Sequence, residues 1–280
     1  MGTIDDGMWE PQSGNSRKAT LSPISSHTSG MVNADDGQND TGCHQIPKEG
    51  TFEYCCAHHP LAPLSTLQKH VLFWDRDLDG IIWPYQIYLG FRELGFGILF
   101  AIGALLISVF FSYPTRFARF SVLQPGTWRN IVPHPLLPIY LSTGAASIHG
   151  SDTGIYSYAG EFSQRRFEEA FDIFDRQDVG GLSAEDSFFL LQKNRCAWDV
   201  PGWCFAFMEW WTTWLLLQKD GRVWKDDLMA CYEGSLFFRI AELERQGNWD
   251  RGYGPTDLLR GMWLGRNWRV WEVEKTRKAQ

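Results

Sequence analysis

An acidic stretch, Asp75–Gln86, constrains the fold more than any other part of this 280-residue chain. Aspartates occupy its first, third and fifth positions, Asp75, Asp77 and Asp79, and Gly80 occupies the sixth. This spacing is typical of the EF-hand loop, which binds Ca²⁺ through oxygen atoms and needs glycine at its sharp turn. Because such a loop joins two helices, the sequence predicts a helix on either side of it.

Two further positions decide how this loop binds an ion. Ile81, at position 7, offers a backbone carbonyl oxygen, as the motif requires. Gln86, at position 12, puts one neutral amide oxygen where glutamate would supply two charged oxygens. The sequence therefore predicts a calcium site of reduced affinity, formed by Asp75, Asp77, Asp79, Ile81 and Gln86. The alternative is a loop that keeps the shape but no longer binds calcium.

A second, degenerate loop begins at Asp175. Val179 stands at its fifth position, where the motif needs an oxygen ligand. We therefore expect this loop to be a structural partner of the first hand.

The segment Leu94–Tyr113 carries no charged side chain. Its length, about 20 residues, is what a helix needs to cross a hydrocarbon core. Arg116 and Arg119 follow directly, and a proline-rich turn, Pro133–Pro138, comes next. These flanks favour contact with a membrane, as a span, as a hairpin or as an oblique helix seated in one leaflet. The alternative is a helix buried in the protein core.

Composition and missing motifs exclude several functions. Asp and Glu outnumber Lys and Arg by 33 to 26, which argues against a nucleic-acid-binding protein. The six cysteines form no CxxC pair, which disfavours a zinc ribbon or a disulfide scaffold and suits a reducing compartment. Neither GxSxG nor HExxH occurs, so no hydrolase signature is visible.

Two histidines are candidate ligands by their positions. Apolar residues at helical spacing predict a helix from Ser65 or Thr66 to Trp74, and His70 lies on it, shortly before the acidic loop. His149 lies in a stretch of short residues that predicts a turn. Imidazole suits haem iron, but haem leaves no short universal motif, and the residues alone do not pair these two histidines.

A series of short blocks follows in one order from about residue 60 to about residue 242. They are Leu67–Tyr85, Gly90–Phe96, the uncharged segment, Pro133–Tyr140, His149–Gly154, Asn194-Arg195, Gly202-Trp203, Glu209-Trp210, Asp220-Gly221 and Gly234–Phe237. In this order the blocks resemble the caleosins, calcium-binding lipid-droplet proteins also known as peroxygenases. The order, more than any single block, carries the resemblance.

The resemblance implies a haem- and calcium-dependent peroxygenase. A b-type haem (haem b, iron) would be held by two histidines, which by position are His70 and His149, and both would serve as catalytic and cofactor-binding residues. Lipid hydroperoxides would donate oxygen to unsaturated fatty acids or other acceptors. The reaction would take place on a lipid monolayer or membrane, at a lipid droplet or the endoplasmic reticulum.

Together these observations predict a mainly α fold, an EF-hand helical core with an apolar membrane-associating hairpin or helix. The expected order is a disordered polar tail over 1–55, a helix with the calcium loop over 60–93, an apolar anchor with a proline turn over 94–140, a helical haem-binding core over 141–245 and a Trp-rich basic extension over 246–280. Two competing functions remain, a non-enzymatic lipid-droplet coat protein and a calcium-switched membrane adaptor.

Overall fold

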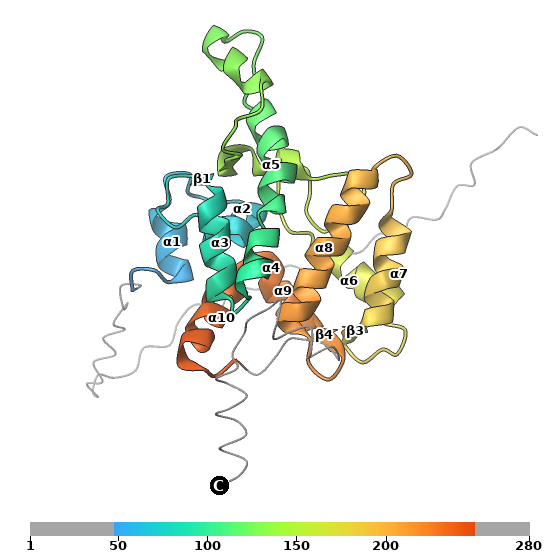
Figure 1. Ribbon diagram of the computed structural model, residues 1–280. Helices are drawn as coiled ribbons and strands as arrows, with labels where there is room; N and C mark the ends of the chain where they lie inside the picture. The colour runs from blue at the N-terminus through green and yellow to red at the C-terminus, as the bar shows by residue number, and fades with distance from the viewer. Residues whose placement is uncertain (1–47, 250–280) are drawn as a thin grey trace, which may run out of the picture. The chain divides into compact units, whose positions relative to one another are not determined.

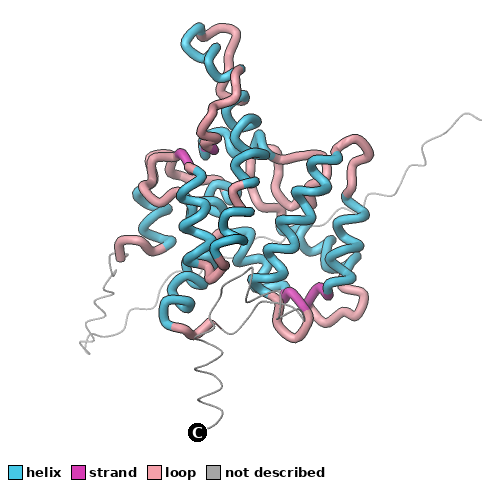
Figure 2. Tube along the Cα trace, viewed as in Figure 1, coloured by secondary structure: helices cyan, strands magenta, loops and turns pink. Residues whose placement is uncertain are grey.

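The computed structural model describes residues 48–249, which are mainly helical (Figures 1 and 2), and this confirms the predicted fold class at that level. The α-helices are α1 Phe52–His58, α2 Thr66–Val71, α3 Pro84–Glu93, α4 Ile98–Gly103, α5 Leu106–Phe117, α6 Gln164–Phe174, α7 Ala184–Asn194, α8 Val200–Leu217, α9 Lys225–Glu233 and α10 Ser235–Gln246. The 3₁₀ helices are η1 Leu72–Trp74, η2 Pro125–Ile131 and η3 Leu141–Ser147. The strands are β1 Ile81–Ile82, β2 Ile139–Tyr140, β3 Gly181–Ser183 and β4 Arg222–Trp224.

Helix α1 lies partly inside the predicted disordered tail, so the prediction of a tail over 1–55 is wrong for its last residues. The helix begins after Thr51, whose hydroxyl oxygen accepts a hydrogen bond from the backbone N–H of Tyr54. Phe52 then packs edge-on against Phe238 of α10, with ring centroids 5.6 Å apart. The tail before residue 48 and the Trp-rich extension after residue 249 lie outside the described residues.

Helix α2 confirms the helix predicted before the acidic loop. Ser65 caps it, because its hydroxyl accepts the N–H of Gln68 while the Gln68 side chain accepts the N–H of Ser65. This reciprocal pair satisfies two backbone donors that a helix start would otherwise leave without partners. The chain continues without a break into η1, which ends just before Asp75. The residue His70 is therefore held on a helix whose far end is the acidic loop.

The short strands of the acidic loop and of the degenerate loop do not pair with each other. Strand β1, from the acidic loop, pairs antiparallel with β2, whereas β3, from the degenerate loop, pairs with β4. The prediction that the two loops are structural partners is therefore wrong. The partner of the degenerate loop lies between α8 and α9, where Leu182 is matched by Val223. Its sequence signal is little more than the pair Asp220-Gly221.

The uncharged segment starts against the core in α4 and leads through α5 into an arm that projects from the rest of the fold (Figure 1). Residues Ile98–Phe117 are long and apolar enough to cross a membrane by length and composition, and only 28% of their most apolar 18-residue window is buried, which argues against a helix enclosed by the core. The chain then turns through η2 and returns to β2, which pairs with β1 (Figure 1). Arg116 joins the two arms by donating hydrogen bonds to the carbonyl oxygens of Arg129 (2.7 Å) and Val132 (2.8 Å).

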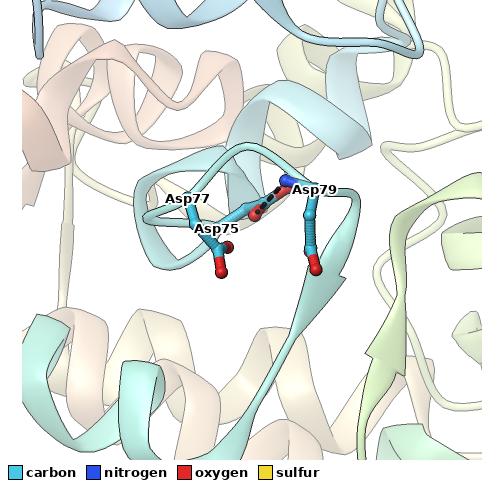
Figure 3. Close-up of side chains that lie close together, drawn as sticks. All are labelled: Asp75, Asp77 and Asp79. Atoms are coloured by element: carbon cyan, nitrogen blue, oxygen red, sulfur yellow. Dashed lines mark hydrogen bonds between the residues drawn. The ribbon is translucent and has the colours of Figure 1, made fainter.

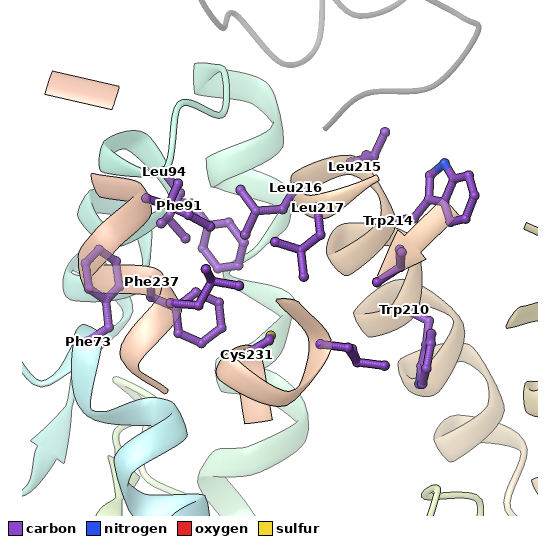
Figure 4. Packing of buried hydrophobic residues seen from close by; sticks show 14 of the residues in the cluster. Phe73, Phe91, Leu94, Trp210, Trp214, Leu215, Leu216, Leu217, Cys231 and Phe237 are labelled. Atoms are coloured by element: carbon purple, nitrogen blue, oxygen red, sulfur yellow. The ribbon is translucent and has the colours of Figure 1, made fainter. Parts of the chain in front are cut away.

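Large apolar side chains from α3, α8, α9 and α10 meet in the core (Figure 4). Trp210 and Trp214 of the Trp-rich helix α8 are buried there, as are Phe167 and Phe171 of α6. Helices α8 and α9 both contribute residues to the site described below.

Gly234 allows the junction of α9 and α10 to approach α2 closely. Its φ of +85° lies in the left-handed region, and a Cβ atom there would come within 2.1 Å of the carbonyl oxygen of Lys69 and 2.8 Å of the Cα of His70. Only glycine satisfies both conditions without strain. The position of His70 therefore depends on a residue far away in the sequence.

We expect Gly234→Ala to lower the free energy of unfolding by about 2–4 kcal/mol, because the left-handed backbone and the overpacking both penalise a side chain. Chemical denaturation of the two proteins measures this difference. Gly126→Ala is the matched control, since a Cβ atom at that position meets nothing within 4 Å. Equal losses in the two variants would contradict the role given to Gly234.

Candidate functional site

Three carboxylates of the acidic loop converge. One oxygen from each of Asp75, Asp77 and Asp79 lies within 4.8 Å of the others, and Figure 3 shows the three side chains gathered inside the loop. Asp75 is buried and accepts the N–H of Gly80 at 2.9 Å, while Asp77 and Asp79 are exposed. Carboxylates held this close repel one another, and a hard cation such as Ca²⁺ relieves that repulsion.

Gln86 is fully buried and turns its amide nitrogen, not its oxygen, toward this cluster. Its Nε2 donates to Oδ1 of Asp77 at 2.9 Å, and its Oε1 accepts the N–H of Trp83 at 2.7 Å, which caps helix α3. To coordinate an ion, the amide would have to rotate and give up the bond from Trp83. Two features of Gln86 therefore lower the expected affinity of the loop for calcium: its side chain lacks a charge, and its oxygen is turned away from the site.

His59 supports the first ligand position and was missed by the sequence analysis. Its Nδ1 accepts the N–H of Leu61, so Nε2 carries the proton and donates to Oδ2 of Asp75 at 2.9 Å. Both side chains are completely buried. A residue at the end of α1 thereby holds Asp75 in one orientation. At metal sites, ligand side chains are commonly oriented by such hydrogen bonds.

In the degenerate loop, an arginine side chain supplies the positive charge beside the carboxylate at position 12. Arg176 donates from Nε to Oδ1 of Asp186, the residue at position 12, at 2.7 Å. Although burial opposes its ionisation, hydrogen bonds from Ser183 and Arg176 lower the pKa of Asp186. A guanidinium group therefore neutralises this carboxylate. Within residues 48–249, Asp75, Asp77 and Asp79 form the one acidic cluster that fits a metal ion.

Both candidate histidines line a single cavity of about 380 Å³. Its walls are mostly apolar side chains of α2, α4, α5 and α8, among them Phe100, Phe111 and Phe205. The structure thus brings His70 and His149 to one site, although they lie far apart in the sequence. A cavity with apolar walls and a few polar groups is the usual form of a site for a cofactor or a lipid chain.

His70 has the tautomer that a metal ligand needs. Its Nδ1 lies 2.7 Å from the carbonyl oxygen of Cys231, which can only accept, so Nδ1 carries the proton and Nε2 keeps its lone pair. Burial lowers the pKa of His70 and so favours the neutral ring. The Cys231 carbonyl and Asp152 act in the opposite direction, but their effect is smaller. Metal-binding histidines are commonly oriented by such a bond to a backbone carbonyl.

His149 is held in a different way. Its Nδ1 lies 3.3 Å from Oδ2 of Asp199 and 3.3 Å from the N–H of Ser151. Asp199 also accepts the N–H groups of Ser151 and Gly202. Although burial opposes its ionisation, these bonds and His149 lower the pKa of Asp199, so a negative charge orients the imidazole. Both contacts are made by Nδ1, so the ring is oriented through that atom and Nε2 points away from them.

Two acids at the cavity were also missed by the sequence analysis. Glu209 and Asp152 line it together with the two histidines. Burial and, second, the charge of Asp152 raise the pKa of Glu209 to about 8. On α8 this glutamate stands among apolar residues, where a charged residue is expected to face solvent, so its position in the sequence carries little signal of a cavity.

Comparisons with known proteins agree with one another. A family model described as "Caleosin related protein" matches residues 62–241. A protein of Lilium longiflorum named "Peroxygenase" is 34% identical over 185 residues, which are 65% of this chain and 71% of that protein. "Probable peroxygenase 4" of Arabidopsis thaliana is 33% identical over 202 residues, 71% of this chain and 90% of that protein.

A third relative differs in its name. "Probable inactive peroxygenase-like protein" of Arabidopsis thaliana is 31% identical over 117 residues, 42% of this chain and 56% of that protein. No solved structure matches the chain.

We expect Gln86→Glu to tighten Ca²⁺ binding at the acidic loop by roughly 10- to 100-fold, because it adds one charge and one ligand oxygen. Isothermal titration calorimetry of the two proteins measures the change. Gln68→Glu, a matched substitution in the capping box of α2, should leave the affinity unchanged. Equal affinities of the wild type and Gln86→Glu would show that position 12 is not a ligand.

Proposed function

Because the chain belongs to the caleosin family, we propose that it is a haem- and calcium-dependent peroxygenase that acts on lipid hydroperoxides at a lipid surface. It is an oxidoreductase of the peroxygenase class, as its relatives are named. The observation that carries the finer proposal is the meeting of two histidines in one apolar cavity.

His70 and His149 are the proposed haem ligands. The donor set fits haem iron, since His70 presents an unprotonated Nε2 and His149 is oriented through its Nδ1. When bound, haem would supply the chemistry that moves one oxygen atom from a hydroperoxide to an acceptor. The chain itself orients the imidazoles, and its phenylalanine-rich walls exclude water and accommodate an acyl chain.

We expect His70→Ala and His149→Ala each to weaken haem binding by more than roughly 10-fold, because each removes a proposed ligand. Titration of haem into the purified protein, followed by its Soret absorption band, gives this affinity. His58→Ala is the control, since His58 is an exposed histidine on α1. If both site variants bound haem as tightly as the wild type, the ligand assignment would be wrong. A wild type that bound no haem would favour the coat protein or the adaptor.

Calcium at the acidic loop is proposed to fix the helix that carries His70. The N–H of Asp75 donates to the carbonyl oxygen of Leu72, so the first ligand position is bonded directly to η1. η1 continues α2, on which His70 lies. Ordering the loop around an ion therefore restrains the imidazole, and we expect calcium to strengthen haem binding by linkage.

The lipid surface is proposed to contact the outward side of α4 and α5. Apolar side chains 41–57% exposed recur there at helical spacing, namely Ile98, Leu99, Ile102, Leu106, Val109, Tyr113 and Phe117. The turn that follows adds Leu123, which is 91% exposed. A contiguous apolar face of this kind marks a membrane or protein contact. The return of the chain to β2 favours a hairpin in one leaflet over a span, and a droplet monolayer or the endoplasmic reticulum offers such a leaflet.

We expect the double substitution Ile102→Lys and Val109→Lys to reduce binding to phospholipid-coated oil droplets by more than roughly 10-fold, because charges in the hydrocarbon region are costly. Flotation of the protein with the droplets measures the bound fraction. The matched control, Ile173→Lys with Val179→Lys, changes exposed apolar residues of α6 and the degenerate loop and should bind like the wild type. Equal flotation of all three proteins would argue against this contact face.

A further inference from the structure

Glu209 presents a carboxyl group without a partner to the cavity. It lies on the face of α8 that also places Phe205, Met208 and Thr212 on the cavity wall. The side chain is exposed to that cavity, and in residues 48–249 it makes no hydrogen bond or ion pair. The side chain therefore holds no other part of the described fold in place and is free to act on a molecule in the cavity.

The groups that surround Glu209 bring its pKa close to neutral pH. Asp152, Tyr156, Cys231 and Tyr232 all interact with it electrostatically, and every one is an acid. No lysine or arginine lines the cavity in the described part of the chain, where the other titratable groups are His70 and His149. Burial and the negative charge of Asp152 raise the pKa of Glu209 to about 8. A group of this pKa both gives and takes a proton readily near neutral pH.

We propose that Glu209 is a catalytic residue of this cavity, the proton shuttle that lets the oxygen–oxygen bond of a lipid hydroperoxide break heterolytically. The inference rests on the proposed peroxygenase function and goes beyond it by adding a residue. It stands on geometry: one carboxyl group without a hydrogen-bond partner lines the same mostly apolar cavity as the two proposed haem ligands.

The proton balance needs no other donor. One oxygen of the protonated carboxyl group gives its proton to the peroxide oxygen that bears the alkyl chain, and the other oxygen takes the proton of the terminal hydroxyl. The pair of electrons in the oxygen–oxygen bond leaves with the alkyl-bearing oxygen, and the hydroperoxide becomes an alcohol. The terminal oxygen atom passes to the lipid acceptor, which is oxidised by two electrons. Glu209 ends in its original protonation state.

The protonation of Glu209 can be tested without haem or activity. Infrared difference spectra of wild type minus Glu209→Gln, recorded on the haem-free protein from pH 5 to pH 10, isolate the C=O stretch of this one carboxyl group. We expect a neutral-acid band that disappears with a midpoint near pH 8. The exposed Glu168→Gln is the matched control and should leave the band assigned to Glu209 in place. A midpoint for Glu209 below about 5 would overturn the inference.

The shuttle itself is tested on the haem-loaded protein with a fatty-acid hydroperoxide and a sulfide acceptor. We expect Glu209→Gln to keep the Soret band of the wild type and to lose roughly 10²- to 10⁴-fold in kcat, the range for a general acid–base group. The fall in wild-type kcat above about pH 8 should be absent from this variant. Glu209→Asp should recover part of the rate, and Glu168→Gln should keep all of it.

The outcomes separate the two proposals. If Glu209→Gln reacted at the wild-type rate, the shuttle would be excluded while the peroxygenase function stood. If the haem-loaded wild type consumed no hydroperoxide, both proposals would fall together.

Discussion

The hydrogen bond from Nδ1 of His70 to the carbonyl oxygen of Cys231 is the contact on which the site depends. It fixes the imidazole tautomer. It also links a side chain of α2 to a backbone carbonyl of α9. Its length requires the two helices to approach closely, and Gly234 makes that approach possible because it has no Cβ atom. Since α2 runs on through η1 into the acidic loop, the same bond anchors one side of that loop.

Local signals were predicted correctly from the sequence, because their information lies within a few residues. The helix start at Ser65 or Thr66 and the spacing of the loop aspartates are of this kind. The bond between His59 and Asp75 and the pairing of β1 with β2 were not predictable, because each joins distant segments. Helix α1 was missed for a related reason: a helix of 7 residues is marginal alone and is held by packing against α10.

The chain handles its acidic groups in three physical ways. The first loop keeps three carboxylates close together, so its charge must be balanced from outside. The degenerate loop balances the carboxylate of Asp186 with Arg176 from its own sequence. In the cavity, the protein surroundings and the charge of Asp152 raise the pKa of Glu209 to about 8. Similar side chains thus acquire different chemistry because each lies in a different dielectric and charge environment.

The pairing of β1 with β2 has a consequence for how the protein reaches an oil phase. The two strands join the chain before α4 and α5 to the chain after them, so that this apolar segment leaves and re-enters the fold at the same place. Immersing its outward side chains therefore requires no polar flank to be carried through hydrocarbon. The proposed lipid contact would then be a partial immersion of this segment, which needs no part of the chain to be threaded across a bilayer.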